Sequence, residues 1–275
     1  MILDDVDARP GSATSLLRTI VGVGLRRLGG RVRVADLIVL MQAVGVAPAA
    51  TRTAVLRVKR KGLLLSDTVA GQPGYRLNPD AVPMLERGDR RIFTFRQQGD
   101  RDPWCLISYS IPETQRDARY QLRRQLAGIG CGTVATGLWI CPAFLADEAE
   151  GILTELGLRK AATLFITQTP QTPGTLAEAA RQWWDLDRLA KLHRAFLLNR
   201  GSDATQPITP EDAFARFIAA LDEWRILPYV DPGLPPSALP VDWPGFDSVA
   251  LFERITATLA APAQRFIDAT LAASR

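Results

Sequence analysis

The chain is poor in the residues that most enzymes use for chemistry. Its 275 residues include a single histidine and three cysteines, Cys105, Cys131 and Cys141, whose spacing matches no metal site. No glycine-rich phosphate loop follows a predicted strand, and no Ser-His-Asp arrangement is evident. We therefore expect no catalytic residues, no metal and no cofactor. We expect the cysteines to be buried reduced thiols, and His193 to be a half-exposed structural residue on a helix.

Long apolar runs are also missing. No stretch approaches the 18 or more apolar residues of a membrane span, and the N-terminal sequence MILDDVDARPGSATS is acidic and polar rather than signal-like. The composition, 47% hydrophobic and 23% charged, is that of a globular chain with room for two or three domains. We expect a cytoplasmic protein with no membrane partner.

Positive charge is abundant only in one N-terminal segment. The whole chain has 33 Lys and Arg against 29 Asp and Glu, a net charge of +4. The segment from residue 18 to residue 61, however, holds a single acid, Asp36, among the basic residues Arg18, Arg26, Arg27, Arg31, Arg33, Arg52, Arg57, Lys59, Arg60 and Lys61. Such an asymmetry is typical of a nucleic-acid-binding surface.

The sequence PAATRTAVLRVKRKG, from 48 to 62, predicts a basic amphipathic helix of about four turns. Pro48 suits its first turn and Gly62 the position after its end. One arc of the helix can pack, since it carries Thr51, Ala54, Val55 and Val58. The opposite arc must meet water or a polyanion, since it carries Arg52, Thr53, Leu56, Arg57, Lys59 and Arg60.

The surrounding pattern predicts a winged helix-turn-helix, in which the basic helix is the third helix. Apolar-periodic segments at 15–28 and 33–46 precede it. The sequence LLLSDTVAGQPGYRL follows it and predicts two antiparallel strands around a Gly-Pro-Gly-bearing turn. Such a helix enters the major groove, so the expected DNA-binding residues are Arg52, Thr53, Arg57, Lys59, Arg60, Lys61 and Arg76. The alternative is that the charge run is a solvated helix face. Leu56 would touch a thymine methyl group or pack on a neighbouring helix.

The rest of the chain predicts an α+β multidomain protein. Strand, helix, two strands around Gly137, helix and strand follow one another from 104 to 168, which is the βαββαβ order of a ferredoxin-like domain. Helical patterns fill 176–200, 209–227 and 245–273 around a proline-rich loop. The expected parts are a winged helix-turn-helix domain (1–80), a connecting helix with loops (81–103), a ferredoxin-like domain (104–170) and a helical C-terminal domain (171–275).

Several of these segments resemble the PaaX-type transcriptional repressors of phenylacetate catabolism. They are ATRTAVLRVKRKGLL, the YRL of the returning strand, the RRIF before the middle domain, and WWDLDRLAKLHRAFL. The most specific is LDEWRILPYVDPGLPPSALPVDWPG. The resemblance covers almost the whole chain.

The resemblance implies a homodimeric repressor of a catabolic operon, and we expect the middle domain at 104–170 to be its dimerisation domain. Since one recognition helix covers only a few base pairs, we expect the double-stranded operator DNA to be an inverted repeat. The resemblance also implies a Cas2-like middle domain and release from DNA by an aryl-CoA thioester such as phenylacetyl-CoA. This chain has TVAGQPG where the family's wing usually carries several arginines, so we expect wing contacts to rest on Arg76. His193 stands where the family has an aromatic residue.

An aryl-CoA site should combine an apolar pocket with cations at its mouth. The proline-rich loop supplies the ingredients, since Trp224, Tyr229 and Trp243 are aromatic and Arg225 is a nearby cation. The alternative is that these aromatics only pin an irregular segment to the helices around it. The effector could also be another aromatic or acidic molecule, or there could be none.

A metal-dependent nuclease of the Cas2 kind is the rival interpretation. Cas2-like nucleases hold their metal with an aspartate at the end of the first strand. This chain has Tyr109-Ser110-Ile111 at that place, and a hydroxyl cannot replace a carboxylate ligand of a hard divalent cation. We therefore expect the middle domain to be non-catalytic.

Overall fold

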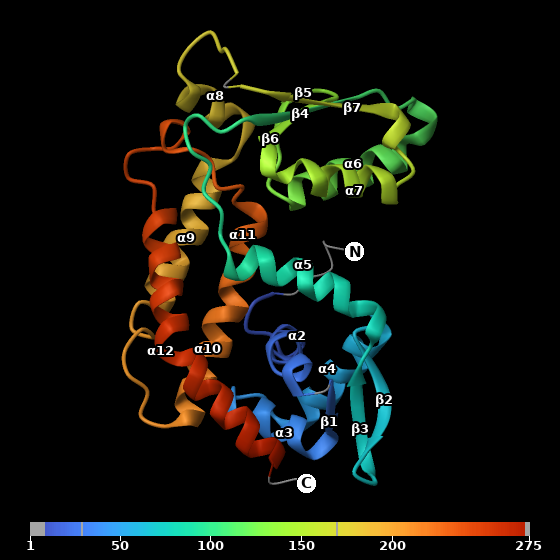
Figure 1. Cartoon of the computed structure of the whole chain (residues 1–275), viewed down its shortest axis with the longest axis vertical. Coiled ribbons are helices and arrows are strands. Elements are labelled where there is room, and N and C mark those ends of the chain that lie inside the picture. The colour runs from blue at the N-terminus through green and yellow to red at the C-terminus, as the bar shows by residue number, and fades with distance from the viewer. Residues whose placement is uncertain (1–8, 29, 169, 273–275) are drawn as a thin grey trace. The chain divides into compact units, whose positions relative to one another are not determined.

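The computed structural model of the chain describes residues 9–28, 30–168 and 170–272 (Figure 1). It contains two compact units, each assembled from separate segments of the sequence. The basic-helix unit comprises 9–92, 196–225 and 247–272, and the four-strand unit comprises 93–195 and 226–246. This division by contacts differs from the four consecutive segments expected from sequence, which remain a prediction.

The N-terminal part of the basic-helix unit contains three helices and a three-stranded antiparallel sheet in the order β1-β3-β2. Its elements are α2 (Ala13–Val23), β1 (Arg31–Arg33), α3 (Val34–Ala43), α4 (Pro48–Arg60), β2 (Leu64–Val69) and β3 (Gln72–Leu77). Helix α2 packs against both α3 and α4. The helix predicted at 15–28 ends earlier, at Val23, and a 3-10 turn covers Leu25–Leu28.

The hairpin after the basic helix is present, but its turn is not where the sequence suggests. The turn is Ala70-Gly71, with φ values of 49° and 74°, and the Gln-Pro-Gly stretch lies inside β3. A two-residue hairpin turn needs positive φ at its central residues, which glycine adopts freely. Pro73 is tolerated in β3 because β1 pairs only with residues 74–76, so the strand has one neighbour at Pro73.

Strand β1 was not expected from the sequence. It pairs with β3 so that Arg31 lies opposite Arg76 and Arg33 opposite Gly74. A Cβ atom on Gly74 would approach the Val32 carbonyl oxygen to 2.7 Å. The glycine therefore permits the close approach of the third strand.

The remaining long helices of this unit are α5 (Val82–Phe93), which follows the hairpin, α10 (Pro210–Trp224) and most of α12 (Gly245–Ala272). Trp224 is fully buried and stacks on Phe252, with ring centroids 4.7 Å apart and an interplanar angle of 13°. Its indole N–H donates to the Ile92 carbonyl oxygen at 3.0 Å. One buried tryptophan thus joins α5, α10 and α12.

The four-strand unit has the predicted βαββαβ order. Its elements are β4 (Trp104–Tyr109), α6 (Arg116–Gly128), β5 (Gly132–Ala135), β6 (Leu138–Pro142), α7 (Ala146–Glu155) and β7 (Ala162–Thr167). The antiparallel sheet has the order β5-β6-β4-β7, and α6 and α7 lie together on one side of it (Figure 1). Along β4, Cys105 and Ile107 join the core under these helices, while Trp104 joins a second cluster with Trp184 and Trp243.

The single helix predicted at 176–200 is broken into α8 (Leu176–Trp183) and α9 (Leu186–Arg200). Trp184 is extended, with φ −126° and ψ 148°, and its indole N–H donates to the Gly130 carbonyl oxygen at 2.8 Å. Asp185 then accepts from the Arg188 backbone N–H at 3.0 Å and starts the second helix. The predicted helix 209–227 likewise ends at Trp224, and α11 (Leu227–Val230) follows.

The three cysteines are buried, as the sequence predicts. The neighbouring thiol of Cys141 on the paired strand, together with burial, raises the pKa of Cys105. His193 is not half-exposed. It is fully buried, with Nε2 at 2.8 Å from Asp231 Oδ2 and its ring 5.6 Å from that of Trp243, because the proline-rich loop folds over α9.

Within the described residues, no single helix is both long and apolar enough to cross a membrane. Helices α3 and α4 meet that criterion only as a pair, and they are bent by 114°. In the same part of the chain, no group of three or more His, Cys, Asp or Glu side chains is placed to hold a metal ion.

Candidate nucleic-acid interface

Helix α4 buries the face that the sequence predicts. It starts at Pro48, and the Thr51 hydroxyl donates back to the Ala47 carbonyl oxygen at 3.1 Å. Its buried residues are Thr51, Ala54, Val55 and Val58. Since α2 and α3 both pack against α4, the opposite face of the helix points outward and is exposed.

The outward face of α4 is cationic. Arg52, Thr53, Arg57 and Arg60 are exposed, as is Lys61 at the C-cap. Leu56 is 59% exposed in the middle of this face, so it is not packed on a neighbouring helix of the unit. Its methyl groups remain available to a ligand.

The structure divides this face into two sides. Lys59 turns toward the hairpin, where its Nζ donates to Ser66 Oγ at 2.6 Å and lies 5.7 Å from the centre of the Tyr75 ring. Arg57 and Arg60 instead line a pocket on the side of α2. These cations lie in one arc of the helical wheel, but in the structure Lys59 contacts the hairpin whereas Arg57 and Arg60 line the pocket.

The pocket between the end of α4 and the start of α2 has a volume of about 500 Å³. The described residues that line it are Arg9, Ser12, Thr14, Arg18, Arg57, Arg60 and Lys61. They include five cations, two hydroxyls and no carboxylate. We call this site the cationic pocket. The sequence pattern missed it because Arg9 and Arg18 lie outside the predicted recognition helix.

The hairpin contributes little charge at its tip. Arg76 is half-buried on β3, the central strand, and lies between Arg31 on β1 and Leu65 on β2. Arg31 Nε is 3.0 Å from Asp67 Oδ2, so one of these cations is already balanced. Any wing contact by Arg76 is therefore made near the base of the hairpin rather than at its uncharged tip.

The four predicted effector residues are buried and fall in different units. Trp224 and Arg225 lie in the basic-helix unit, and Tyr229 and Trp243 lie in the four-strand unit. Arg225 donates from Nε to Asp222 Oδ1 at 3.2 Å and from Nη2 to Ser15 Oγ at 2.8 Å. These contacts favour the alternative in which the residues hold the helices together.

Asp222 is the centre of this buried network. Its Oδ1 accepts from the hydroxyls of Ser15 and Thr19, both at 2.7 Å, and its Oδ2 accepts from the Gly11 backbone N–H at 2.8 Å. The carboxylate is 1% exposed. It therefore ties the start of α2 to the end of α10.

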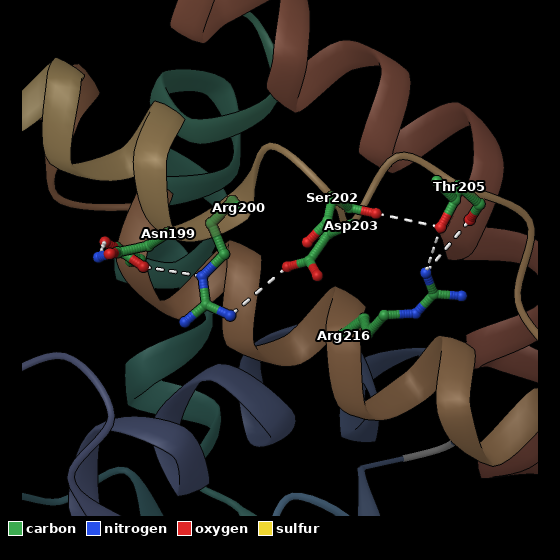
Figure 2. A network of polar contacts seen from close by, with 7 residues as sticks. Asn199, Arg200, Ser202, Asp203, Thr205 and Arg216 are labelled. Atoms are coloured by element: carbon green, nitrogen blue, oxygen red, sulfur yellow. Dashed lines mark hydrogen bonds and ion pairs between the residues drawn. The ribbon is translucent and has the colours of Figure 1, made fainter.

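A second network fixes the loop between α9 and α10 (Figure 2). Arg200 Nε lies 2.8 Å from Glu223 Oε2, and its Nη1 lies 3.5 Å from Asp203 Oδ2. Arg216 donates to Asp212 Oδ2 at 2.8 Å and to the Thr205 hydroxyl at 3.0 Å. Both arginines have carboxylate partners on their own unit.

Three family models match consecutive parts of the chain. The model of a PaaX-like protein matches residues 12–81, that of the PaaX protein central Cas2-like domain matches 97–179, and that of the PaaX-like protein C-terminal domain matches 184–269. The chain belongs to the PaaX family. The PaaX resemblance inferred from the sequence is therefore confirmed, as is the Cas2-like middle domain.

Two relatives of the PaaX-family chain span nearly all of it. Transcriptional repressor PaaX of Escherichia coli (strain K12) is 25% identical over 272 residues, which are 96% of this chain and 85% of that protein. The solved structure of Uncharacterized protein Rv0674 from Mycobacterium tuberculosis covers 92% of this chain and 97% of its own, with a TM-score of 0.59 and 22% identity. The second likeness concerns the fold alone.

The Cas2-like domain of this PaaX-family chain carries Ser110 directly after β4. Its backbone N–H donates to the Ala161 carbonyl oxygen at 3.0 Å, and the residue is exposed. Ser110 is therefore located at the end of the first strand, where the sequence comparison with Cas2-like nucleases expects a metal-binding aspartate.

Proposed function

We propose that this protein is a dimeric, sequence-specific DNA-binding repressor of a catabolic operon. Helices α2, α3 and α4 with the β2-β3 hairpin form a winged helix-turn-helix, and α4 is its recognition helix. The observation that carries the proposal is the outward face of α4, which is cationic, exposed and followed directly by the hairpin. The repressor named among its relatives supports the same function.

In this proposal α4 enters the major groove. Arg52 and Arg57 are candidates for guanine contacts, because a guanidinium can donate two hydrogen bonds to one guanine edge. Lys59, held against the hairpin, is suited to a backbone phosphate. Leu56 offers an apolar contact to a thymine methyl group.

The dimer follows from the short reach of one recognition helix. One helix covers only a few base pairs, so specificity requires two, and the operator should be an inverted repeat with half-sites about one or two helical turns apart. We expect the Cas2-like domain to join the protomers. Its edge strand β7 supports this expectation, since Phe165 and Ile166 are 53% and 60% exposed on it.

The effector in this proposal is an aryl-CoA thioester. It releases DNA only if it binds better to a dimer geometry in which the two recognition helices no longer match their half-sites. Because Arg225 is occupied by Asp222 and Ser15, we do not expect it to hold the ligand's phosphates. The protein would act in the cytoplasm and not as an enzyme.

Footprinting and anisotropy on the DNA beside the protein's own gene test the proposal. We expect one protected inverted repeat and a dimer at micromolar concentration. Phenylacetyl-CoA, free CoA and phenylacetate are then titrated against the complex, and only the thioester should release the DNA. A monomer or a single unrepeated site would contradict the dimeric reading, and release by none of the three would contradict the effector.

The Cas2-like domain gives the nuclease alternative its own test. Labelled DNA incubated with the protein and Mg²⁺ or Mn²⁺ should stay intact, because Ser110 offers no carboxylate to a hard cation. Cleavage that disappears on Asp102→Asn or Asp117→Asn would support a nuclease instead.

A further inference from the structure

The cationic pocket combines two ends of helices that are far apart in the sequence. Thr14 and Arg18 come from the first half of α2, and Ser12 and Arg9 from its N-cap and the segment before it. Arg57, Arg60 and Lys61 come from the end of α4. Recognition of bases needs only the outward face of α4. The contribution of α2 is therefore not explained by the base-reading face.

The two sides of the first turns of α2 differ in charge, because one side faces the Asp222 carboxylate and the other faces the pocket. The first turn of α2 carries no acidic residue, so the positive end of the helix is not neutralised from within. Ser15 and Thr19 form one row that faces Asp222, whose charge is balanced by Arg225. The adjacent row, with Thr14 and Arg18, lines the pocket.

The end of α4 completes the site with exposed cations. Among the described residues, no ion pair joins Arg57 or Arg9 to an acid. Like charges brought to one concave site repel one another, and the repulsion is relieved when an anion is bound.

We propose that the cationic pocket binds a phosphate group. Its principal contacts are Arg18 of α2, Arg9 just before that helix, and Arg57 and Arg60 of α4. Arginine donates to phosphate oxygens in a planar fork, and the pocket offers several such donors with two hydroxyls. Its volume of about 500 Å³ exceeds the need of a bare phosphate, so there is room for the group to which the phosphate is attached.

The phosphate can come from the DNA backbone or from a soluble phosphorylated molecule. The first source rests on the proposed function and makes α2 a clamp on the strand beside the groove. The second source would place a small anion on Arg57 and Arg60, in competition with DNA. In both cases Arg57 contacts phosphate in place of the guanine contact considered above, so that of the two candidate arginines only Arg52 is left to read a base.

The test compares the full chain with the double variant Arg9→Gln/Arg18→Gln, which leaves α4 unchanged. The matched control is Arg116→Gln/Arg123→Gln, which removes two exposed arginines from α6 of the four-strand unit. Calorimetric titration with pyrophosphate, at constant ionic strength, should show binding to wild type and control and at least tenfold weaker binding to the double variant. Circular dichroism and thermal melting without ligand establish that each variant is folded.

A second arm measures binding to a duplex over a range of salt concentrations. If a DNA phosphate occupies the pocket, the double variant should reduce the slope of log affinity against log salt by about one or two, and pyrophosphate should displace DNA from wild type. If the ligand is soluble, pyrophosphate binding is lost while the slope stays unchanged. Pyrophosphate binding and a salt slope both equal to wild type in the folded double variant would overturn the proposal.

The two arms also separate this proposal from the proposed function. A chain that binds no duplex at all contradicts the repressor assignment, but the pyrophosphate titration still decides whether the pocket is a phosphate site.

Discussion

Two groups of arginines in the basic-helix unit show how surroundings decide the role of one side chain. Arg200 and Arg216, the two arginines beside the loop after α9 that Figure 2 draws, each bind a carboxylate of their own unit. Arg57 and Arg60, at the end of α4, line a pocket in whose described lining no carboxylate occurs. The first group holds a loop in place, and the second leaves positive charge available. A ligand site is thus indicated by unbalanced charge rather than by the number of cations.

Arg225 is the extreme case of the first group, because it is both paired and buried. It is 6% exposed, and its guanidinium is held by Asp222, which is 1% exposed. Removing one partner of such a pair leaves the other charge buried and uncompensated.

The largest effect should therefore come from Asp222→Ala. We expect a loss of about 3–5 kcal/mol in the free energy of unfolding, since Arg225 loses its counter-ion and the hydroxyls of Ser15 and Thr19 lose their acceptor. Urea denaturation followed by tryptophan fluorescence measures it. Asp242→Ala, which removes an exposed pair with Arg194, is the control and should change stability by less than about 1 kcal/mol. If Asp222→Ala lost no more stability than the control, water would have replaced Asp222 as the partner of the Arg225 guanidinium.

The next effect separates two arginines on the same face of α4. Arg52→Ala should cost about 1–3 kcal/mol on operator DNA and relax the preference at one base pair, because a guanine contact is lost. Arg57→Ala should weaken operator and random DNA alike and lower the salt slope by about one, because it faces the cationic pocket. Anisotropy on both duplexes measures the difference. A relaxed base preference for Arg57→Ala would remove this residue from the pocket assignment.

The basic helix was predictable because its signals are local. Apolar periodicity, Pro48 at the start and Gly62 after the end all lie within fifteen residues, and α4 ends where they indicate. The βαββαβ order was predictable for the same reason. The patterns that predict each strand, helix and turn of this domain lie within short stretches of consecutive residues.

The sequence predictions that were wrong concern features set by contacts between residues far apart in the chain. The break before α9 follows from the hydrogen bond of Trp184 to Gly130, and a Cβ on Gly132 would come within 2.5 Å of the Trp184 ring. No helical pattern contains that information. The Pro-Gly pair in the hairpin looked like a turn, but the two positive φ values fall at Ala70 and Gly71.

The cationic pocket was missed for the same reason as the helix break. Arg9 precedes Arg57 by 48 residues and Arg18 precedes it by 39. The packing of α2 on α4 brings them together. The effector residues proposed from the sequence stay a prediction, but the structure adds contacts of Arg225 that its position in the sequence does not reveal. Arg225 was placed at a pocket mouth from sequence proximity, whereas it binds Asp222 and Ser15 inside the unit.

A smaller effect is expected from Lys59→Ala. Its ammonium is held by Ser66 and lies over Tyr75, so it is positioned before DNA arrives. Loss of one phosphate contact should weaken all sequences equally and lower the salt slope by about one, without a change in base preference. Salt titrations on operator and random duplexes measure this result. Lys191→Ala, at an exposed position of α9, serves as the charge control. A salt slope equal to that of wild type in Lys59→Ala would show that Lys59 contacts only the hairpin.

The smallest effect should be that of Arg216→Gln, which tests whether an arginine paired with a carboxylate contributes to DNA affinity. Its guanidinium is 20% exposed and the Asp212 carboxylate 33%, and partly exposed pairs of this kind contribute about 0–1 kcal/mol to stability. We expect a change of that size in urea denaturation and an unchanged salt slope on DNA, because the charge removed was already balanced. Arg57→Gln, measured beside it, removes the same charge from the cationic pocket and should lower the slope. If both substitutions lowered the slope equally, net charge alone would govern DNA affinity, and the distinction between balanced and unbalanced arginines would fail.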